Sequence, residues 1–351
     1  MKARNTTIKI YSGGSDVTAL YPLESFKYSS SIDGEADTVE MELADVKRVI
    51  LENRLPARGS AFTFVIYKNS WNSKILTENA PSLSLPLGCF ELDEINYSSP
   101  SKLTLKLTSV PNRAGLRGIE RDRSYEETNL QKIAADIAGR AGLRLNYAVN
   151  EEIKINRAEQ SGESDLSFLE KLCKNNGLNL KLYDNQIVIF DAAEIEKNAP
   201  VIEITPDLPI IIRHSFKVKS ADVYDSAAVS FLPNGIGEIA GLFGDIFESI
   251  FGEKTTSDSG DNILKINQKT RSTAESERLA KSKLREKNKK EFTLNLTVSG
   301  SFSFVAGNTF TIKNFGDLFD GKYICDRVDH EIGSNGGYTT QVQAHKVLQG
   351  Y

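Results

Sequence analysis

Three histidines are the residues of this chain whose chemistry can be judged first, because imidazole nitrogens bind metals and exchange protons near neutral pH. They are His214, His330 and His345. His330 and His345 could meet across a sheet and hold a metal together with a carboxylate such as Asp329. No two candidate ligands stand at a short helical or turn spacing, so ordinary surface or core histidines are the favoured interpretation. We therefore expect neither a metal nor a cofactor.

The sequence lacks the motifs that place a nucleophile or cradle a phosphate. It contains no Gly-x-Ser-x-Gly, no Gly-x-x-x-x-Gly-Lys-Ser/Thr and no His-Glu-x-x-His segment. The 47 Asp and Glu residues would allow some pair of carboxylates to imitate a glycosidase site. Abundance alone selects no such pair, so the sequence predicts no catalytic residues and no enzymatic activity.

A run of cations raises the question of nucleic-acid binding. It consists of Lys281, Lys283, Arg285, Lys287, Lys289 and Lys290. Glu277 and Glu286 precede Lys281 and Lys290 by four residues, which is the spacing of ion pairs on a solvated helix face. The run contains no aromatic side chain on which a base could stack. The net charge of -4 also gives no general attraction to nucleic acid or an anionic membrane, so we expect no nucleic-acid binding.

Cysteines and apolar runs indicate the compartment. Cys89, Cys173 and Cys325 are odd in number and far apart, which predicts reduced thiols in place of disulfides or a zinc knuckle. No apolar run approaches the roughly 20 residues of a membrane helix, so we expect no stable membrane insertion. Residues 1–6 lead directly into a strand-like pattern without a signal-peptide core, which predicts folding in a cytoplasm.

Helices and strands must position any functional side chain. The N-terminal and C-terminal parts of the sequence both have the pattern of β structure. Apolar and polar residues alternate in four N-terminal segments, 39–43, 62–67, 90–95 and 103–107. Such alternation gives each strand one buried and one wet face. Similar segments return towards the C-terminus, and many short strands with turn-rich connections are typical of small barrels or sandwiches. We predict two β-barrel-like domains, at 1–115 and 199–351.

The middle of the chain, 116–198, has a helical pattern. A capping box at Ser124 precedes an apolar stripe at helical spacing, and Gly142 is a suitable C-cap. A second helix is predicted to begin at Ser164 or the next residue and to end at Gly177, and each helix is followed by a strand-like segment. The complete prediction is an α+β fold in which this small α+β module is flanked by the two β-barrel-like domains.

The segment 233–262 does not fit the β pattern and is predicted to be a helical insertion in the second barrel domain. Between 236 and 251 its apolar side chains fall on one half of a helical wheel, and its glycines and acidic residues fall on the other. A helix packed on its own domain is one interpretation. The glycines would leave such a helix weak alone, however, and its acidic polar face suits a membrane surface poorly. Our hypothesis is therefore a helix that docks into a partner's groove, with Phe243 and Phe247 as anchors. The complete set of predicted partner-binding residues is Ile239, Phe243, Ile246, Phe247 and Ile250. A charged helix is predicted after it, at 273–290.

Three features in this order resemble a known family. A β-rich part leads through Ser-Tyr-Glu-Glu-Thr-Asn-Leu (124–130) into a helix that ends in Ala-Gly-Leu (141–143). The segment Gln-Ser-Gly-Glu-Ser-Asp-Leu-Ser-Phe-Leu (160–169) looks like the family's Gln-x-x-Glu-Ser-Asp-hydrophobic-x-Phe-Leu. After the charged helix come Val-Ala-Gly-Asn-Thr-Phe (305–310) and Gly-Lys-Tyr (321–323). The chain thus resembles the phage late control D proteins, baseplate hub proteins of contractile tails that are related to the hub half of type VI secretion spike proteins.

The resemblance implies a structural protein of a contractile phage tail or a phage-tail-like particle. It implies a homotrimeric ring that joins the hexameric tail tube to the trimeric spike, with two similar barrel domains from each subunit. The tail tube protein and the spike protein would be partners, and the tape-measure protein and the baseplate wedge are further candidates. The protein would be assembled in the bacterial host cytoplasm and reside in the tail baseplate of the virion or particle.

Two further expectations depend on the extent of the sequence and on its middle module. Proteins that fuse hub and spike continue into further β domains, whereas this sequence stops at Tyr351, so we expect the spike to be a separate polypeptide. An alternative function stays open, because small folds with paired helix–glycine–strand units also bind peptidoglycan. The chain would then be a tail-tip protein that binds or hydrolyses the cell wall, and a tip protein of a non-contractile tail is a third possibility.

Overall fold

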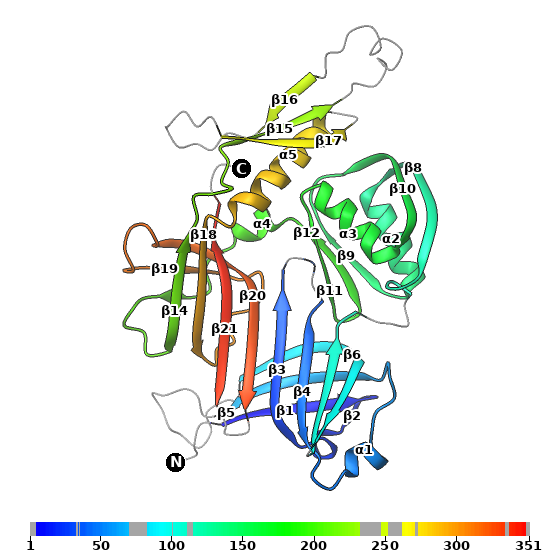
Figure 1. Cartoon of the computed structure of the whole chain (residues 1–351), viewed down its shortest axis with the longest axis vertical. Helices are drawn as coiled ribbons and strands as arrows, with labels where there is room; N and C mark the ends of the chain where they lie inside the picture. Colours follow the sequence, from blue (N-terminus) through cyan, green and yellow to red (C-terminus); the bar gives the residue numbers. More distant parts are fainter. Residues whose placement is uncertain are drawn as a thin grey trace.

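The computed structural model describes residues 5–32, 34, 36–69, 83–99, 101–110, 115–231, 247–251, 262–270, 273–333 and 337–348. The protein is mostly β-sheet with a few helices. Figure 1 shows two large β units, a middle module and a small annex. No helix in the described part is long and apolar enough to cross a membrane.

The N-terminal β unit buries alternate side chains of its strands. In β4, Val39, Met41 and Leu43 are fully buried, whereas Glu40 and Glu42 lie on the opposite face, as the alternating sequence predicts. The unit consists of β1 (Asn5–Ser12), β2 (Ser15–Asp16), η1 (Thr18–Leu20), β3 (Leu23–Ser31), β4 (Thr38–Ala44), α1 (Val49–Asn53), β5 (Ala61–Asn69), β6 (Leu83–Ser98) and β7 (Lys102–Thr108).

The second β unit has its own hydrophobic core. Leu294, Leu296 and Val298 of one strand pack there with Phe310 and Tyr323 of two others. The unit consists of β13 (Glu203–Ile204), β14 (Ile211–Val218), β18 (Phe292–Ser299), β19 (Thr309–Ile312), β20 (Gly321–Gly333) and β21 (Tyr338–Lys346).

The two β units share one sheet instead of forming two separate barrels. β20 pairs with β3, from Arg327 opposite Ser31 to Gly333 opposite Ser25. The resulting row of strands is β14-β18-β21-β20-β3-β4-β7-β6, and each neighbouring pair in it is antiparallel. Each β unit therefore contributes four strands to this row. Beyond β6 the sheet continues through β5, β1 and β2, and β5 pairs with the first half of β6 only.

In the middle module, the predicted end of the first helix and the predicted start of the second helix are confirmed. The predicted start of the first helix is wrong. Ser164 is the N-cap of α3 and accepts a hydrogen bond from the Ser167 amide, and Gly142 ends α2 with a φ of 65°. The capping box at Ser124 is wrong, because this residue lies in β8 and pairs with β10, which satisfies its backbone; Asn129 caps α2 instead. The elements are β8 (Glu120–Asn129), α2 (Leu130–Ala141), β9 (Arg144–Ala148), β10 (Lys154–Ser164), α3 (Asp165–Asn175), β11 (Asn179–Tyr183), β12 (Gln186–Phe190) and α4 (Ala192–Glu196).

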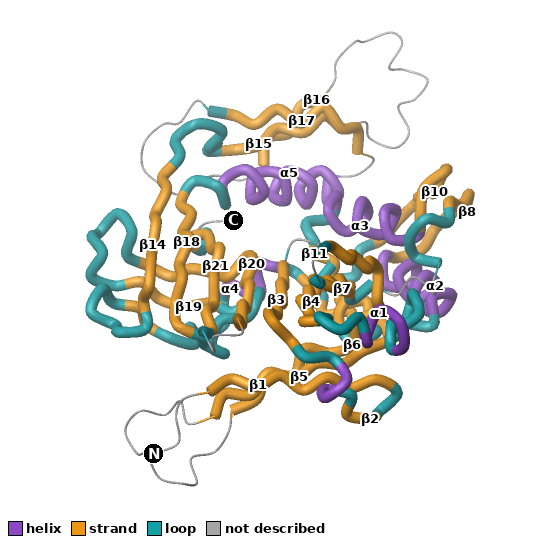
Figure 2. The backbone as a smooth tube through the Cα atoms, turned by 60° about the horizontal axis from the view of Figure 1, so that its bottom comes forward, coloured by secondary structure: helices purple, strands orange, loops and turns teal. Residues whose placement is uncertain are grey.

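The annex is a small sheet with one helix packed along it, as Figure 2 shows. It consists of β15 (Ser226–Phe231), β16 (Phe247–Phe251), β17 (Ile263–Thr270) and α5 (Thr273–Asn288). The helix predicted at 273–290 is therefore confirmed to within two residues. The helix predicted over 236–251 is wrong for its last five residues, which pair antiparallel with β15. Aromatic and β-branched residues favour a strand where an edge offers backbone partners, and this preference prevails there over the helical spacing.

A buried ion pair connects the N-terminal β unit to the middle module. Asp37 is fully buried, and its Oδ1 lies 3.1 Å from Nζ of Lys181 on β11. The Tyr28 hydroxyl donates a hydrogen bond of 3.0 Å to the same carboxylate. Burial raises the pKa of Asp37, and Lys181 and Tyr28 oppose that shift. The two modules are thus held together at a point where the carboxylate depends on the lysine for compensation.

The first prediction follows from this dependence. Lys181→Met should lower the free energy of unfolding by about 3–5 kcal/mol, because it leaves a buried carboxylate without its cation. The matched control is Lys171→Met, whose exposed pair with Glu163 is 3.4 Å long and should change stability by less than about 1 kcal/mol. Urea unfolding followed by circular dichroism measures both, and Asp37→Asn added to Lys181→Met should recover part of the loss. Equal effects of the two lysine substitutions would contradict the assignment.

Candidate functional site

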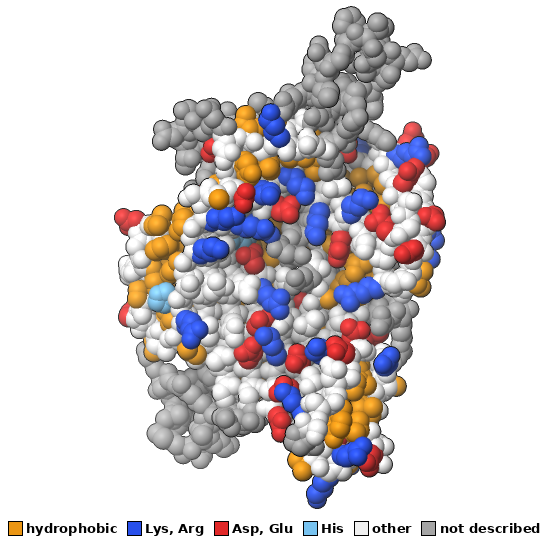
Figure 3. Space-filling model, in the orientation of Figure 1, with side chains coloured by type: hydrophobic (Ala, Val, Ile, Leu, Met, Phe, Trp, Pro, Cys, Tyr) orange, Lys and Arg blue, Asp and Glu red, His pale blue; other side chains and the backbone are white. Residues whose placement is uncertain are grey.

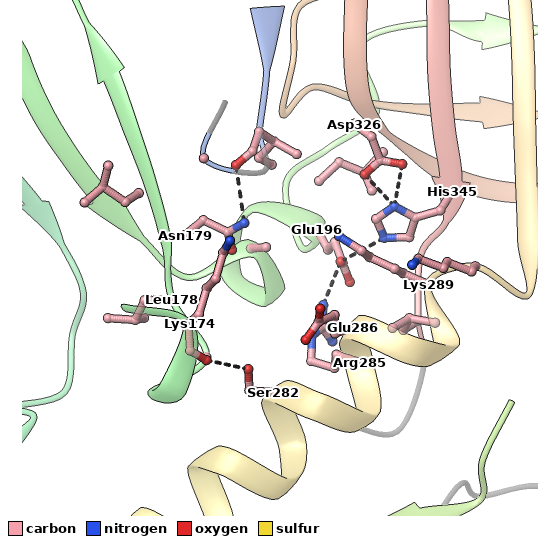
Figure 4. A pocket seen from close by; sticks show the side chains of 18 of the residues that line it. Lys174, Leu178, Asn179, Glu196, Ser282, Arg285, Glu286, Lys289, Asp326 and His345 are labelled. Atoms are coloured by element: carbon pink, nitrogen blue, oxygen red, sulfur yellow. Dashed lines mark hydrogen bonds and ion pairs between the residues drawn. The ribbon is translucent and has the colours of Figure 1, made fainter. Parts of the chain in front are cut away.

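A cavity with a polar lining lies where the modules meet. It has a volume of about 330 Å³ and is lined by α3, α4, α5, β11, β20 and β21. Figure 4 shows charged side chains from these elements pointing toward one another across it. No local sequence motif indicates this site, because the residues that line it come from segments that are distant in the sequence, from Ile32 to Leu348.

Four of these side chains form a connected ionic network. His345 Nδ1 on β21 lies 2.7 Å from Oδ1 of Asp326 on β20. Its Nε2 lies 3.6 Å from Oε1 of Glu196 at the end of α4. Arg285 of α5 donates a hydrogen bond of 2.7 Å from Nη2 to the same Glu196 oxygen. His345 and Glu196 are buried, and the network joins the second β unit, helix α4 and the annex.

The charges of the network decide what it can do. Burial lowers the pKa of His345, but the Asp326 and Glu196 carboxylates outweigh it and raise this pKa to about 9. Burial also raises the pKa of Glu196, and His345 and Arg285 outweigh it, so that the pKa is lowered. At neutral pH two cations therefore face two anions. A general base needs a neutral imidazole, so His345 does not suit that role at neutral pH, and the four side chains form an ionic connection between modules.

Helix α5 makes further contacts with the middle module. The Ser282 hydroxyl donates a hydrogen bond of 2.9 Å to the Lys174 carbonyl oxygen. Arg278 Nε donates one of 3.3 Å to Oδ1 of Asn176, at the end of α3. Arg278, Ser282 and Arg285 stand at the i, i+4 and i+7 positions of α5, so one face of this helix attaches the annex to the rest of the chain.

The structure separates the histidines that could have formed a metal site. Along the β20–β21 hairpin His345 is opposite Ile324, and His330 is opposite Thr340, so the two do not meet. His330 is buried, which lowers its pKa to about 4, and its Nδ1 lies 2.7 Å from the Tyr338 hydroxyl. In the described residues no group of three potential ligands could hold a metal ion. His214 lies exposed on β14 beside Phe315.

The predicted partner-binding residues fall mostly outside the described part. Ile239, Phe243 and Ile246 lie there, and so does most of the segment 233–262. Phe247 and Ile250 belong to β16 and pair with Phe231 and Ala228 of β15. The proposed docking role of these residues stays a prediction, whereas their helical form is corrected at Phe247 and Ile250.

Solved structures share this fold over nearly the whole chain and define its class. The tail protein from Neisseria meningitidis MC58 has a TM-score of 0.68 at 12% identity, covering 97% of both chains. The 43 kDa tail protein of prophage MuSo2 from Shewanella oneidensis has a TM-score of 0.69 at 12% identity, covering 97% of this chain and 98% of its own. A type VI secretion component of E. coli has a TM-score of 0.56 at 12% identity, covering 98% of this chain and 78% of its own. The fold is that of phage tail and type VI secretion proteins.

Curated relatives narrow this class. Both are named "Probable baseplate hub protein": the one of Escherichia phage 186 is 27% identical over 202 residues, and the one of Escherichia phage P2 is 28% identical over 204 residues. Each match covers 56% of this chain and 48% of the relative, so the chain spans about half the length of the curated relatives it matches. No family model matches the sequence. The predicted resemblance to baseplate hub proteins is confirmed: the chain is similar to the probable baseplate hub proteins of phages 186 and P2.

The second prediction concerns the pH dependence of the buried network. The folded pKa of His345 is about 9, above the value of about 6.5 expected in the unfolded chain. The stabilisation is therefore complete below about pH 6.5, declines as the pH rises and is lost above about pH 9. In that window the free energy of unfolding should fall by up to about 1.4 kcal/mol per pH unit.

Urea unfolding between pH 6 and pH 9.5 measures this slope. His345→Gln should remove the decline, because glutamine does not titrate, and the exposed His214→Gln should retain it. A decline of the same size in His345→Gln would show that another group causes it.

Proposed function

We propose that the protein is a structural baseplate hub of a contractile phage tail or a phage-tail-like particle. The single observation that supports this most strongly is the agreement of two independent comparisons. The curated relatives are named as baseplate hub proteins, and the tail-protein fold extends over nearly the whole chain. The protein would accordingly reside in the tail baseplate of the particle after assembly in the host cytoplasm.

The proposed mechanism is symmetry matching by a homotrimeric ring. Each chain contributes two groups of four strands to its row, one group from each β unit. Three chains would thus present six similar groups to the hexameric tail tube and three identical faces to the trimeric spike. Closure into a ring would also remove the open sheet edges that otherwise invite aggregation. The tube protein and the spike protein are the proposed partners, with the tape-measure protein and the baseplate wedge as further candidates.

We propose no catalytic activity for the chain. The polar cavity holds a compensated ionic network whose histidine is protonated at neutral pH, and the relatives carry the names of structural components. The alternative, a tail-tip protein that binds or hydrolyses peptidoglycan, has no observation of its own in its favour. It is retained below as an outcome that the experiment can reveal.

The third prediction tests the ring and the alternative together. The purified chain should form a particle of three copies at micromolar concentration, measured by light scattering and mass photometry. The same preparation should release no soluble fragments from purified cell wall, with lysozyme as the positive control. A monomer that persists after addition of the spike protein contradicts the ring, and release of fragments supports the alternative.

The fourth prediction concerns the segment 233–262, which we propose binds another tail component. Phe243→Ser combined with Phe247→Ser should leave the ring intact and reduce the yield of infective or killing particles at least about tenfold, because aromatic anchors carry much of the binding energy of an interface. Particle counts in complementation of a deletion strain measure this effect. Unfolding of the double variant would indicate core residues, and a normal particle yield would show that the segment is dispensable.

A further inference from the structure

The annex is connected to the rest of the chain at one place. It is inserted between β14 and β18, which are neighbouring strands of the row, so the chain enters and leaves it side by side (Figure 1). Next to this place the Lys219 amide donates a hydrogen bond of 2.8 Å to the Glu291 carbonyl oxygen and extends the pairing of the two strands. A module held by two adjacent chain segments can pivot at that point while its own structure is preserved.

Two short connectors lie between this hydrogen bond and the annex. The Asn288 side chain donates a hydrogen bond of 2.7 Å to the Tyr224 carbonyl oxygen and accepts one of 2.9 Å from the Tyr224 amide. These bonds tie the start of the annex to the end of α5, so the connectors are residues 220–223 and 289–290. Neither belongs to a helix or strand, and Asp222 turns the first with a φ of 60°. Hinges commonly consist of a few such residues at the ends of elements.

The annex has a hydrophobic core of its own. Its buried members are Leu279, Ala280 and Leu284 of α5 with Ala227 and Val229 of β15. In the part of the chain that the structure describes, no hydrophobic cluster combines residues of the annex with residues of another module. Movement of the annex as a body would therefore carry its core along and would not pull a shared core apart.

The interface between α5 and the middle module is polar and close. Arg278 Nη1 lies 3.5 Å from Oε1 of Glu151, in addition to the hydrogen bonds that Arg278 and Ser282 donate. A Cβ atom at Gly177 would lie 3.5 Å from Cβ of Ser282, so the two backbones approach closely. Figure 3 shows Lys and Arg side chains gathered on this side of the molecule, below the annex. Water can replace polar partners but not apolar packing, so such an interface can open and close.

The polar cavity lies in this interface. Ser282, Arg285 and Glu286 of α5 line one side of it, and Lys174 and Asn179 of the middle module line another. In Figure 4 the helix and the middle module lie on different sides of the space. The cavity is therefore bounded on the side of α5 only while the annex rests against the rest of the chain.

We infer that the annex is a hinged cover of this cavity, which pivots at residues 220–223 and 289–290 and closes through the polar face of α5. Closure pairs Arg285 with the buried Glu196, and opening gives both charges to water. No strand of the annex belongs to the row, so the movement leaves the row unchanged. The cover is built into the single chain and would work in a monomer as well as in the proposed ring.

An engineered disulfide can report the closed position. Gly177→Cys with Ser282→Cys places two Cβ atoms 3.5 Å apart, within the range of about 3.5–4.5 Å that disulfides need. Equilibration with glutathione gives the effective concentration of the two thiols, which is proportional to the closed fraction. Mass spectrometry of peptides distinguishes this bond from any that involves Cys89, Cys173 or Cys325. The strain of a side chain at Gly177, whose φ is 76°, is common to all the variants compared.

Two pairs of substitutions are compared in this double-cysteine background. The interface variant, Arg278→Met with Arg285→Met, should lower the effective concentration at least about tenfold, because the closed annex then leaves Glu196 short of a cation. The control variant, Lys281→Met with Lys287→Met, should change it less than about twofold. It removes two exposed cations of the same helix, neither of which bonds to another module in the described part. Hydrogen exchange followed by mass spectrometry checks that α5 keeps its protection in each variant.

The combined results decide between a hinged and a fixed annex. A disulfide in the background, a lowered effective concentration in the interface variant alone and preserved protection of α5 support the hinged cover. Failure of the disulfide to form overturns the closed position. An unchanged effective concentration in the interface variant, or an equal fall in the control variant, shows that this face of α5 does not hold the annex and overturns the inference. A fall together with lost protection of α5 shows unfolding in place of a pivot and overturns it as well.

Discussion

The pairing of β20 with β3 is the constraint on which the rest of the structure depends. It joins strands about 300 residues apart in the sequence through a ladder from Arg327 opposite Ser31 to Gly333 opposite Ser25. Lys27 of β3 reinforces it with an ion pair of 2.7 Å to Glu331 of β20. Backbone hydrogen bonds between neighbouring strands fix both distance and direction, so the two β units cannot move as separate barrels. The chain between these strands is consequently closed into a loop by this pairing, and such distant contacts slow folding.

The middle module and the annex cannot extend this sheet from its faces, so they are attached by side chains. Both attachments use buried charges: Asp37 with Lys181 for the middle module, and Glu196 with Arg285 and His345 for the annex. A buried ion pair adds little net stability compared with a well-packed apolar contact, but removal of either partner is costly. Such pairs therefore penalise misplacement of a module more than they strengthen the fold. The two attachments differ in one respect, because only the annex depends on a histidine that loses its charge at alkaline pH.

The sequence predicted correctly the elements that depend on neighbouring residues. The wrong predictions lie where a strand distant in the sequence pairs with the segment. The alternation around Met41 and the caps at Ser164 and Gly142 depend on neighbouring residues, and all three are confirmed. Ser124 and Phe247 have helical signals but lie in strands, because a partner strand distant in the sequence satisfies their backbones. β3 itself escaped prediction because its last residues are buried serines, Ser29 to Ser31, where an apolar alternation would be expected. The network around Glu196 has no local pattern at all, so only the folded structure reveals it.

The direction of the strands bears on how such a hub would carry load. Hydrogen bonds between antiparallel strands lie perpendicular to the strand axes. A force along the strands therefore loads all the bonds of a ladder together, whereas a force across them opens the ladder one bond at a time. If the proposed ring has its axis along the strands, force between tube and spike is directed along the ladders of the row. The long β20–β21 and β20–β3 ladders would then be loaded in the direction in which they resist best. The annex lies outside this row and is attached through side chains of α5, so its displacement would leave the ladders of the row intact.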